Sequence, residues 1–249
     1  MINRVLAVSL LAGLLAGLIV AALQHVTTTP LILKAETYEA ALRAVAPSHA
    51  AFSDHGSFVS EAKIVLAHGG DAHGDHDAWA PQDGLHRTLF TSLVTIATAI
   101  GFAALLLGGM IAANDTIDER RALIWAACGF LAFGLVPAIG LAPELPGAAA
   151  AALESRQIWW IFTALITAGA IFVFLRMETP WLRALAVLAV LVPHVVGAPH
   201  PSAPESKVPA EVAAHFAALS LAVQAALWLI TGFAVGRLWP WFTRRAEAR

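Results

Sequence analysis

Three observations predict that this chain is an all-α integral membrane protein with about six transmembrane helices. Hydrophobic residues make up 59% of the sequence and the mean hydropathy is +0.73. Charged residues account for 13%, against roughly 25% in a soluble domain. Long uncharged runs point the same way, because a bilayer core of about 30 Å requires about 20 apolar residues per helix. Five runs lack Asp, Glu, Lys and Arg: 5–23, 88–113, 122–142, 158–175 and 212–236.

The first run has a second interpretation, a cleaved secretory signal peptide. Arg4 precedes it, and Val20, Ala21 and Ala22 offer small residues near its end. However, its apolar stretch is long for a signal peptide, and Gly13 and Gly17 have the spacing of a close helix-packing face. We therefore expect a retained transmembrane helix.

The sequence predicts one membrane domain, 1–249, interrupted by a long outer loop, 24–87. Residues 29–43 of this loop have helical character after Pro30. Residues 46–78 are rich in Gly, His and Asp, a composition that predicts mobility because it offers little apolar surface to bury.

The most polar part of the loop, 68–77, holds His68, His73 and His76 together with three aspartates. Imidazole and carboxylate ligands suit borderline divalent ions such as Co²⁺, Ni²⁺, Zn²⁺ and Cu²⁺. Because glycines separate these ligands, we expect weak, adaptable metal capture rather than a rigid site. A solvated acidic linker that happens to contain histidines is the alternative.

A sixth apolar run, 184–198, is shorter than the others and contains Pro193 and His194. It fits either a spanning helix with a bent end or a re-entrant segment. The distribution of positive charge favours a spanning helix, and a five-helix topology is the alternative.

Six crossings with both termini in the cytoplasm put most cations inside, as the positive-inside rule requires. The short inner segments then carry Arg4, Arg120, Arg121, Arg176, Arg183, Arg237, Arg244, Arg245 and Arg249. The same topology places every histidine outside: His25, His49, His55, His68, His73, His76, His86, His194, His200 and His215.

Six candidate metal ligands lie where the helices meet the outer surface. They are His25, Glu36, Glu39, His194, Glu211 and His215. Glu211 and His215 are four residues apart and so share one helical face. Ionisable groups at membrane depth indicate function because their isolated burial is costly, although His194 could instead bond to a carbonyl freed beside Pro193. We interpret five of them, His25, Glu36, Glu39, His194 and His215, as a mouth leading between the helices, and Glu211 with His215 as a possible two-ligand edge.

Several function classes find no support. A formal net charge of −2 gives no sign of a nucleic-acid partner, and the sequence lacks a phosphate-binding loop ending in Gly-Lys-Ser or Gly-Lys-Thr. The single cysteine, Cys128, fits a packing role. We assign no catalytic residue and no organic cofactor, and expect a protein that is not an enzyme.

Five sequence blocks resemble the CbtA family of predicted cobalt transporter subunits. They are 35–39 (AETYE), 79–88 (WAPQDGLHRT), 154–160 (ESRQIWW), 193–199 (PHVVGAP) and 216–221 (FAALSL). The resemblance implies a multi-pass subunit of a bacterial inner-membrane cobalt uptake system linked to cobalamin synthesis. It also implies a partner, CbtB, which is a small single-span protein with a histidine-rich end. Family members are usually described with five spans.

Together these inferences predict uptake of a divalent cation, with Co²⁺ first and Ni²⁺ or Zn²⁺ as alternatives. The ion would be captured by histidines and carboxylates at the periplasmic face and pass between the helices. Two other classes stay open: a membrane-bound metalloenzyme, which needs about three fixed ligands and an open coordination position, and a metal-capture accessory protein for another permease. The sequence leaves open whether the protein is an oligomer.

Overall fold

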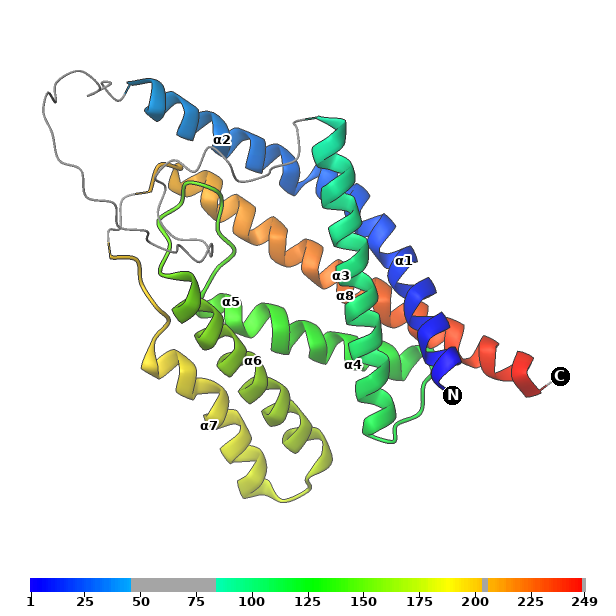
Figure 1. Cartoon of the computed structure of the whole chain (residues 1–249). Helices are drawn as coiled ribbons and strands as arrows, with labels where there is room; N and C mark the ends of the chain where they lie inside the picture. Colours follow the sequence, from blue (N-terminus) through cyan, green and yellow to red (C-terminus); the bar gives the residue numbers. More distant parts are fainter. Residues whose placement is uncertain (46–83, 203–205, 248–249) are drawn as a thin grey trace, which may run out of the picture.

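The computed structural model describes residues 1–45, 84–202 and 206–247, and this part of the chain is helical without strands. Figure 1 shows the arrangement. The elements in chain order are α1 (Ile2–Val26), α2 (Thr28–Val45), α3 (Leu85–Ala112), α4 (Glu119–Phe130), the π-helix η1 (Leu131–Leu135), α5 (Val136–Gly140), α6 (Leu153–Arg176), α7 (Pro180–Val196) and α8 (Ala210–Glu247).

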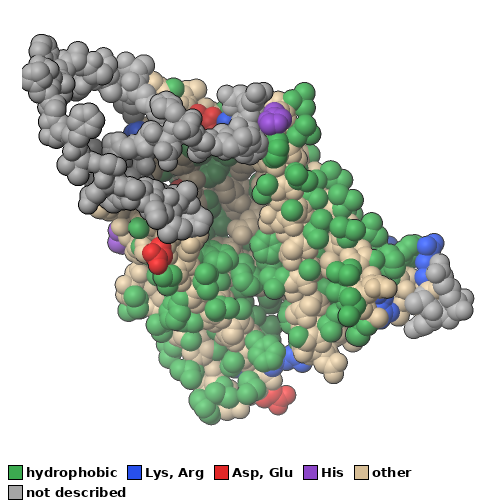
Figure 2. All heavy atoms as spheres, in the orientation of Figure 1, with side chains coloured by type: hydrophobic (Ala, Val, Ile, Leu, Met, Phe, Trp, Pro, Cys, Tyr) green, Lys and Arg blue, Asp and Glu red, His purple; other side chains and the backbone are tan. Residues whose placement is uncertain are grey.

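Five helical segments are long and apolar enough to cross a membrane: α1, α3, the continuous α4–η1–α5 segment, α6 and α8. Large apolar side chains such as Leu93, Leu165 and Leu188 remain exposed on the helices. Hydrophobic side chains dominate the side of the molecule seen in Figure 2, and charged side chains lie toward its ends. Exposed apolar surface of this extent is suited to lipid, so the predicted all-α membrane fold is confirmed.

The sixth run forms α7, a 17-residue apolar helix that is shorter than the five others. Its rise of about 25 Å is slightly less than a typical bilayer core. α7 packs antiparallel to α6 (Figure 1), and its last turn reaches the beginning of α6, where His194 contacts Trp159. α7 thus runs back alongside α6. It is shorter than the five candidate spans, and the sixth crossing stays a prediction.

Small residues let the helices of the core approach closely. A Cβ atom added to Gly13 would lie 2.3 Å from Ile100 Cα, and one added to Gly17 would lie 2.6 Å from Ile96 Cα. The predicted packing face of α1 is thus the surface that meets α3. A similar contact joins α8 to α4, since a Cβ on Gly232 would lie 2.8 Å from the carbonyl oxygen of Ala122.

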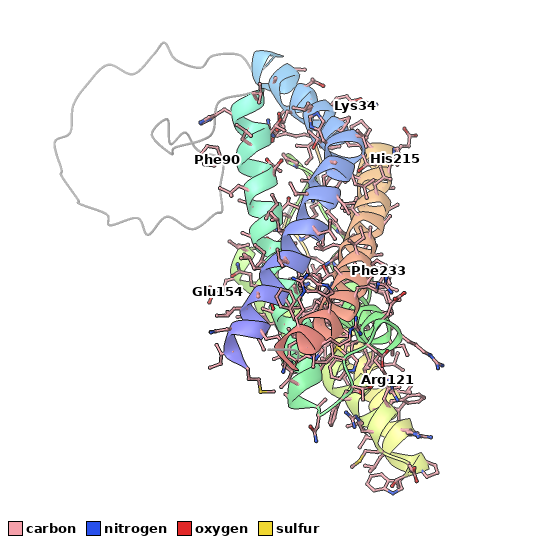
Figure 3. All side chains as sticks on the ribbon, turned by 90° about the vertical axis from the view of Figure 1, so that its right-hand side faces the viewer. Lys34, Phe90, Arg121, Glu154, His215 and Phe233 are labelled. Atoms are coloured by element: carbon pink, nitrogen blue, oxygen red, sulfur yellow. The ribbon has the colours of Figure 1, made fainter. Side chains whose placement is uncertain are left out.

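The bundle has two ends, which we name by their contents. At the termini face the beginning of α1 meets the end of α8: Arg4 Nη1 donates to Thr243 Oγ1 at 2.9 Å, and the Arg4 guanidinium lies 4.4 Å from the centre of the Trp239 ring. The opposite end is the α2 face, where α2 lies. Figure 3 shows Lys34 and His215 together at this end and Arg121 toward the other.

Candidate functional site

The two faces differ in their ionisable side chains. Within the described ranges, all five histidines lie at the α2 face, at or beside helix ends: His25, His86, His194, His200 and His215. The termini face carries eight described arginine side chains, at Arg4, Arg120, Arg121, Arg176, Arg183, Arg237, Arg244 and Arg245. Imidazoles are therefore concentrated at one end of the bundle and guanidinium groups at the other.

An apolar contact holds α2 against this end of the bundle. Ala35 is fully buried in a cluster with Val208, Val212 and Phe216 around the start of α8. Leu145, from the segment between α5 and α6, completes the cluster, and Leu31 and Ile32 of α2 pack against it. The predicted helix after Pro30 thus has one apolar side that docks on the membrane domain.

Glu36 fixes α2 to the first turn of α3. Arg87 Nη1 donates to Glu36 Oε2 at 2.9 Å, and Arg87 Nη2 donates to Oε1 of the same carboxylate. These hydrogen bonds lower the pKa of Glu36; partial burial opposes the shift and the charge of Arg87 adds to it. Glu36 would have to release Arg87 before it could bind a metal ion.

Glu39, one turn further along α2, covers Gly147. A Cβ atom added to Gly147 would lie 2.8 Å from Glu39 Oε1, and the glycine has a φ of +77°. Its carbonyl accepts a hydrogen bond from Lys207 N at 3.2 Å. A side chain at residue 147 would therefore disturb both α2 and the entry to α8.

The described residues of the predicted mouth lie at the same face but are not joined into one site. His25 is exposed at the end of α1, and Glu211 and His215 are exposed at the beginning of α8. No three His, Cys, Asp or Glu side chains within the described ranges lie close enough together to hold a metal ion. His68, His73 and His76 fall outside the residues described. The mouth remains a prediction.

His194 is half-buried at the end of α7. Its ring meets the Trp159 ring edge to face, with centroids 5.7 Å apart, and Nε2 is buried without a hydrogen-bond partner among the described atoms. Trp159 Nε1 donates to the Pro193 carbonyl at 3.3 Å. This leaves one imidazole nitrogen for a water molecule or an ion at the end of α7.

A polar feature inside the bundle was missed by the sequence analysis. Pro137 has no N–H, so the carbonyl of Phe133, four residues earlier, loses its usual helical donor. The structure supplies Gln224 Nε2 from α8, at 3.4 Å from the Phe133 oxygen. A Cβ on Gly134 would lie 2.8 Å from Gln224 Oε1, so the glycine makes room for this amide. A proline in one apolar run and a glutamine in another were the available signals.

Gln224 borders a cavity of about 690 Å³ near the α2 face, between the η1–α5 segment, α6 and α8. We call it the α2-face cavity. Its polar lining includes Glu144, Arg156 and Gln157, and Arg156 Nη2 lies 2.8 Å from Glu144 Oε2. The cavity therefore extends from the Glu144–Arg156 ion pair at the start of α6 to the Gln224 amide beside the π-helix.

A second cavity, of about 630 Å³, lies between α3, α4 and α6 near the termini face. We call it the termini-face cavity. Its walls are mostly apolar, including Leu106, Phe172 and Trp228, and its polar groups come from Asp115, Arg121 and Arg176. Phe133 lines both cavities.

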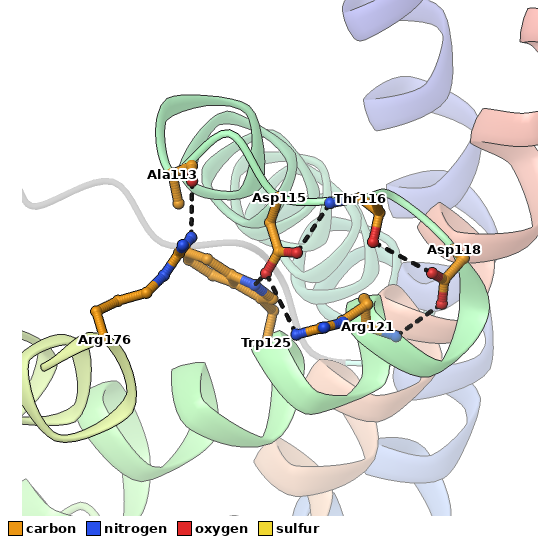
Figure 4. Close-up of polar contacts among 7 residues, drawn as sticks. All are labelled: Ala113, Asp115, Thr116, Asp118, Arg121, Trp125 and Arg176. Atoms are coloured by element: carbon orange, nitrogen blue, oxygen red, sulfur yellow. Dashed lines mark hydrogen bonds and ion pairs between the residues drawn. The ribbon is translucent and has the colours of Figure 1, made fainter. Parts of the chain in front are cut away.

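Asp115 organises the polar end of the termini-face cavity (Figure 4). Its carboxylate accepts from Trp125 Nε1 at 2.9 Å and from Thr116 N at 2.8 Å, and Arg121 Nη1 lies 3.9 Å away. The Trp125 hydrogen bond is the main cause of a lowered pKa for Asp115, while burial opposes it. Arg176 Nη2 donates to the Ala113 carbonyl at 2.7 Å, which ties α6 to the end of α3.

These observations define the class of the protein: a multi-pass α-helical membrane protein with imidazoles at one face and arginines at the other. A family described as "Probable cobalt transporter subunit (CbtA)" matches residues 2–240. The chain belongs to this family, which confirms the resemblance inferred from its sequence blocks. No curated protein and no solved structure matches the chain.

Proposed function

We propose that the chain is the membrane subunit through which a divalent cation, Co²⁺ before Ni²⁺ or Zn²⁺, enters a bacterial cell from the α2 face. The observation that carries this proposal is the concentration of all five described histidines at that face. Membership of a family of probable cobalt transporter subunits supports both the ion and the activity. Imidazole and carboxylate groups suit both Co²⁺ and its neighbours in the first transition row.

The arginines of the termini face support the orientation that we propose. Positively charged segments remain on the cytoplasmic side of a bacterial inner membrane, so the termini lie in the cytoplasm and the α2 face meets the periplasm. A potential negative inside then favours entry of a divalent cation by about 4.6 kcal/mol per 100 mV.

Capture is stepwise in this proposal, because the described ligands are not gathered into one site. His68, His73 and His76 bind the ion weakly and raise its concentration near the bundle. His25, Glu39, Glu211 and His215 pass it to His194, whose Nε2 is buried, and Glu36 joins only if Arg87 releases it. Ligands spread over several helices exchange an ion faster than a closed tetrahedral site would.

A second subunit belongs to this proposal. The family description, a transporter subunit, implies a complex, and we propose a small single-span CbtB-like protein with a histidine-rich end as the partner. The chain acts as a transporter component rather than as an enzyme.

The test is accumulation of cobalt, nickel and zinc in bacteria that lack their own importers and express the chain with and without the partner. We expect selective cobalt uptake that falls in the His194→Ala variant. His200→Ala is the matched control, because His200 lies at the same face outside the proposed set. Unchanged cobalt in cells with the complex confirmed in the membrane would contradict import and favour metal capture for another permease, or an enzyme.

A further inference from the structure

We propose that the cation crosses the bundle through the two cavities, and that the Phe133 ring is the barrier between them. This inference rests on the proposed function, since it names the route of the same ion. The route runs from the α2-face cavity, past the π-helix, into the termini-face cavity. The histidines of the α2 face deliver the ion to this route without lining it.

The first support for this route is the position of Phe133. It is the residue in the π-helix that borders both cavities, and its ring lies between two tryptophans. The ring stacks on Trp228 with centroids 5.9 Å apart and an interplanar angle of 15°, and it meets Trp160 at 6.2 Å and 41°. Trp160 lines the α2-face cavity and Trp228 lines the termini-face cavity. Three aromatic rings thus form a partition one side chain thick.

The backbone at this partition is an irregular π-helix with a carbonyl that accepts from a side chain, which is unusual at membrane depth. Irregular backbone is tolerated inside a bilayer where it is buried in protein or lines a hydrated cavity, and π-helices occur often at functional sites. Pro137 cannot donate to the carbonyl of Phe133, and Gln224 Nε2 approaches this carbonyl oxygen at 3.4 Å. A cation arriving beside the partition would find carbonyl and amide oxygen atoms there.

Charges are arranged differently at the two cavities. In the α2-face cavity Glu144 pairs with Arg156, so an arriving cation competes with one arginine for one carboxylate. In the termini-face cavity Asp115 is opposed by both Arg121 and Arg176. The excess positive charge there disfavours retention of a cation, which promotes its release at the termini face.

Apolar constrictions block ions by excluding water and conduct only when they widen. Phe133 is suited to this role because its ring is partly exposed to both cavities while Trp228, its stacking partner, is 1% exposed. Trp228 is held in turn by Phe102, at 4.7 Å between centroids, and it fills the space above Gly129. The fixed side of the partition is therefore Trp228, and the side able to move is Phe133.

The single cysteine gives a direct test, because Cys128 lines the termini-face cavity and is half-buried. A membrane-impermeant methanethiosulfonate reagent is applied to either face of oriented vesicles containing the full chain. In the unmodified chain we expect labelling of Cys128 from the termini face only. In Phe133→Ala we expect labelling from the α2 face to rise about tenfold, as for a barrier lowered by about 1.4 kcal/mol.

Leu131→Ala is the matched control, since Leu131 belongs to the same π-helix but is 38% exposed on the outside of the bundle. Cys128→Ser gives the background. Phe133→Leu, which removes the aromatic ring but keeps an apolar side chain, serves if the alanine variant does not fold, and a smaller rise in labelling from the α2 face is expected there. Absence of labelling from the termini face, or equal α2-face labelling in Phe133→Ala and Leu131→Ala, would overturn the inference.

A cobalt uptake measurement separates this inference from the proposed function. We expect Gln224→Ala and Phe133→Ala to change cobalt entry severalfold, while Leu131→Ala does not. Normal uptake in all three variants would reject the route and leave import intact. Labelling as expected, with no uptake by the unmodified complex, would reject import and leave the two cavities and their partition established.

Discussion

At the termini face, Asp115 accepts hydrogen bonds from Trp125 and Thr116 and Asp118 caps α4, whereas at the α2 face His25, Glu211 and His215 are exposed. The termini face uses its charges to hold helix ends together. The α2 face is held by the apolar cluster around Ala35 and by the pairs Glu36–Arg87 and Glu144–Arg156, while the three exposed side chains take no part in these contacts. Ionisable groups that are not needed for the fold are available to bind ions, and this difference supports the proposal that an ion is first bound at the α2 face.

The largest effect on stability is expected at the termini face, for Asp115→Ala. Removing this carboxylate takes away the acceptor of a partly buried hydrogen bond from Trp125 Nε1 and of an exposed one from Thr116 N. A typical hydrogen bond contributes about 0.5–1.5 kcal/mol, so losing both costs about 1–2 kcal/mol. We expect a loss of this size in unfolding by sodium dodecyl sulfate in mixed micelles. A stability equal to that of the unmodified chain would show that the Asp115 contacts do not hold this face together.

A smaller loss is expected for Asp118→Ala. Asp118 Oδ1 accepts from Arg121 N at 2.9 Å and so caps the first turn of α4. Loss of such a cap costs about 1 kcal/mol, measurable in the same titration. Asp118→Asn is the matched variant, because asparagine keeps the acceptor, and it should retain most of the stability; equal losses in both variants would point to charge rather than capping.

Acid should weaken both faces in the same direction. Glu36 and Asp115 have pKa values below their ordinary ones in the folded chain, because of hydrogen bonds from Arg87 and Trp125 respectively. The stability that they contribute is present above their unfolded pKa values, near 4, and is lost as the pH falls through the lowered folded values. Unfolding measured between pH 7 and pH 3 should show this loss, with a weaker pH dependence in Asp115→Ala. An unchanged pH dependence in that variant would exclude Asp115 as a source.

The smallest stability change is expected for Glu211→Ala and His215→Ala. Both side chains are exposed in the first turns of α8, and surface substitutions of this kind stay within about 0.5 kcal/mol. Cobalt uptake by the complex should nevertheless fall in both variants. A loss of stability comparable to that of Asp118→Ala would contradict the difference between the two faces, because Glu211 and His215 would then contribute to the fold.

Most of the fold was predictable because its signals are local. Runs of about 20 apolar residues identify spanning helices without knowledge of their neighbours, and the spacing of Gly13 and Gly17 predicted the face of α1 that packs on α3. The partners Ile96 and Ile100 were not predictable, because a packing face does not specify what covers it. The sequence also predicted the short apolar helix α7. Whether α7 crosses the membrane stays a prediction, because the helix is shorter than the five candidate spans.

The candidate site was less predictable because it depends on contacts between distant parts of the chain. The pairing of Glu36 with Arg87 joins residues 51 positions apart and removes one predicted ligand from immediate use. The contact between Gln224 and Phe133 joins residues 91 positions apart. Pro137 and Gln224 were each visible in the sequence. Only the packing of α8 against η1 shows that Gln224 donates to the Phe133 carbonyl, which Pro137 leaves without its usual helical donor.

The contact between Arg4 and Thr243, which lie 239 positions apart, has a consequence for biogenesis. α1 is the first of these helices to be synthesised and α8 is the last, yet the core cluster combines Val8 and Ala12 of α1 with Trp228 and Val235 of α8. During insertion, α1 and α3 can pair early, but one side of that pair must face lipid until α8 arrives. The bundle therefore closes only once α8 has been inserted, and a ribosome that stalls before α8 would leave an open intermediate exposed to membrane quality control.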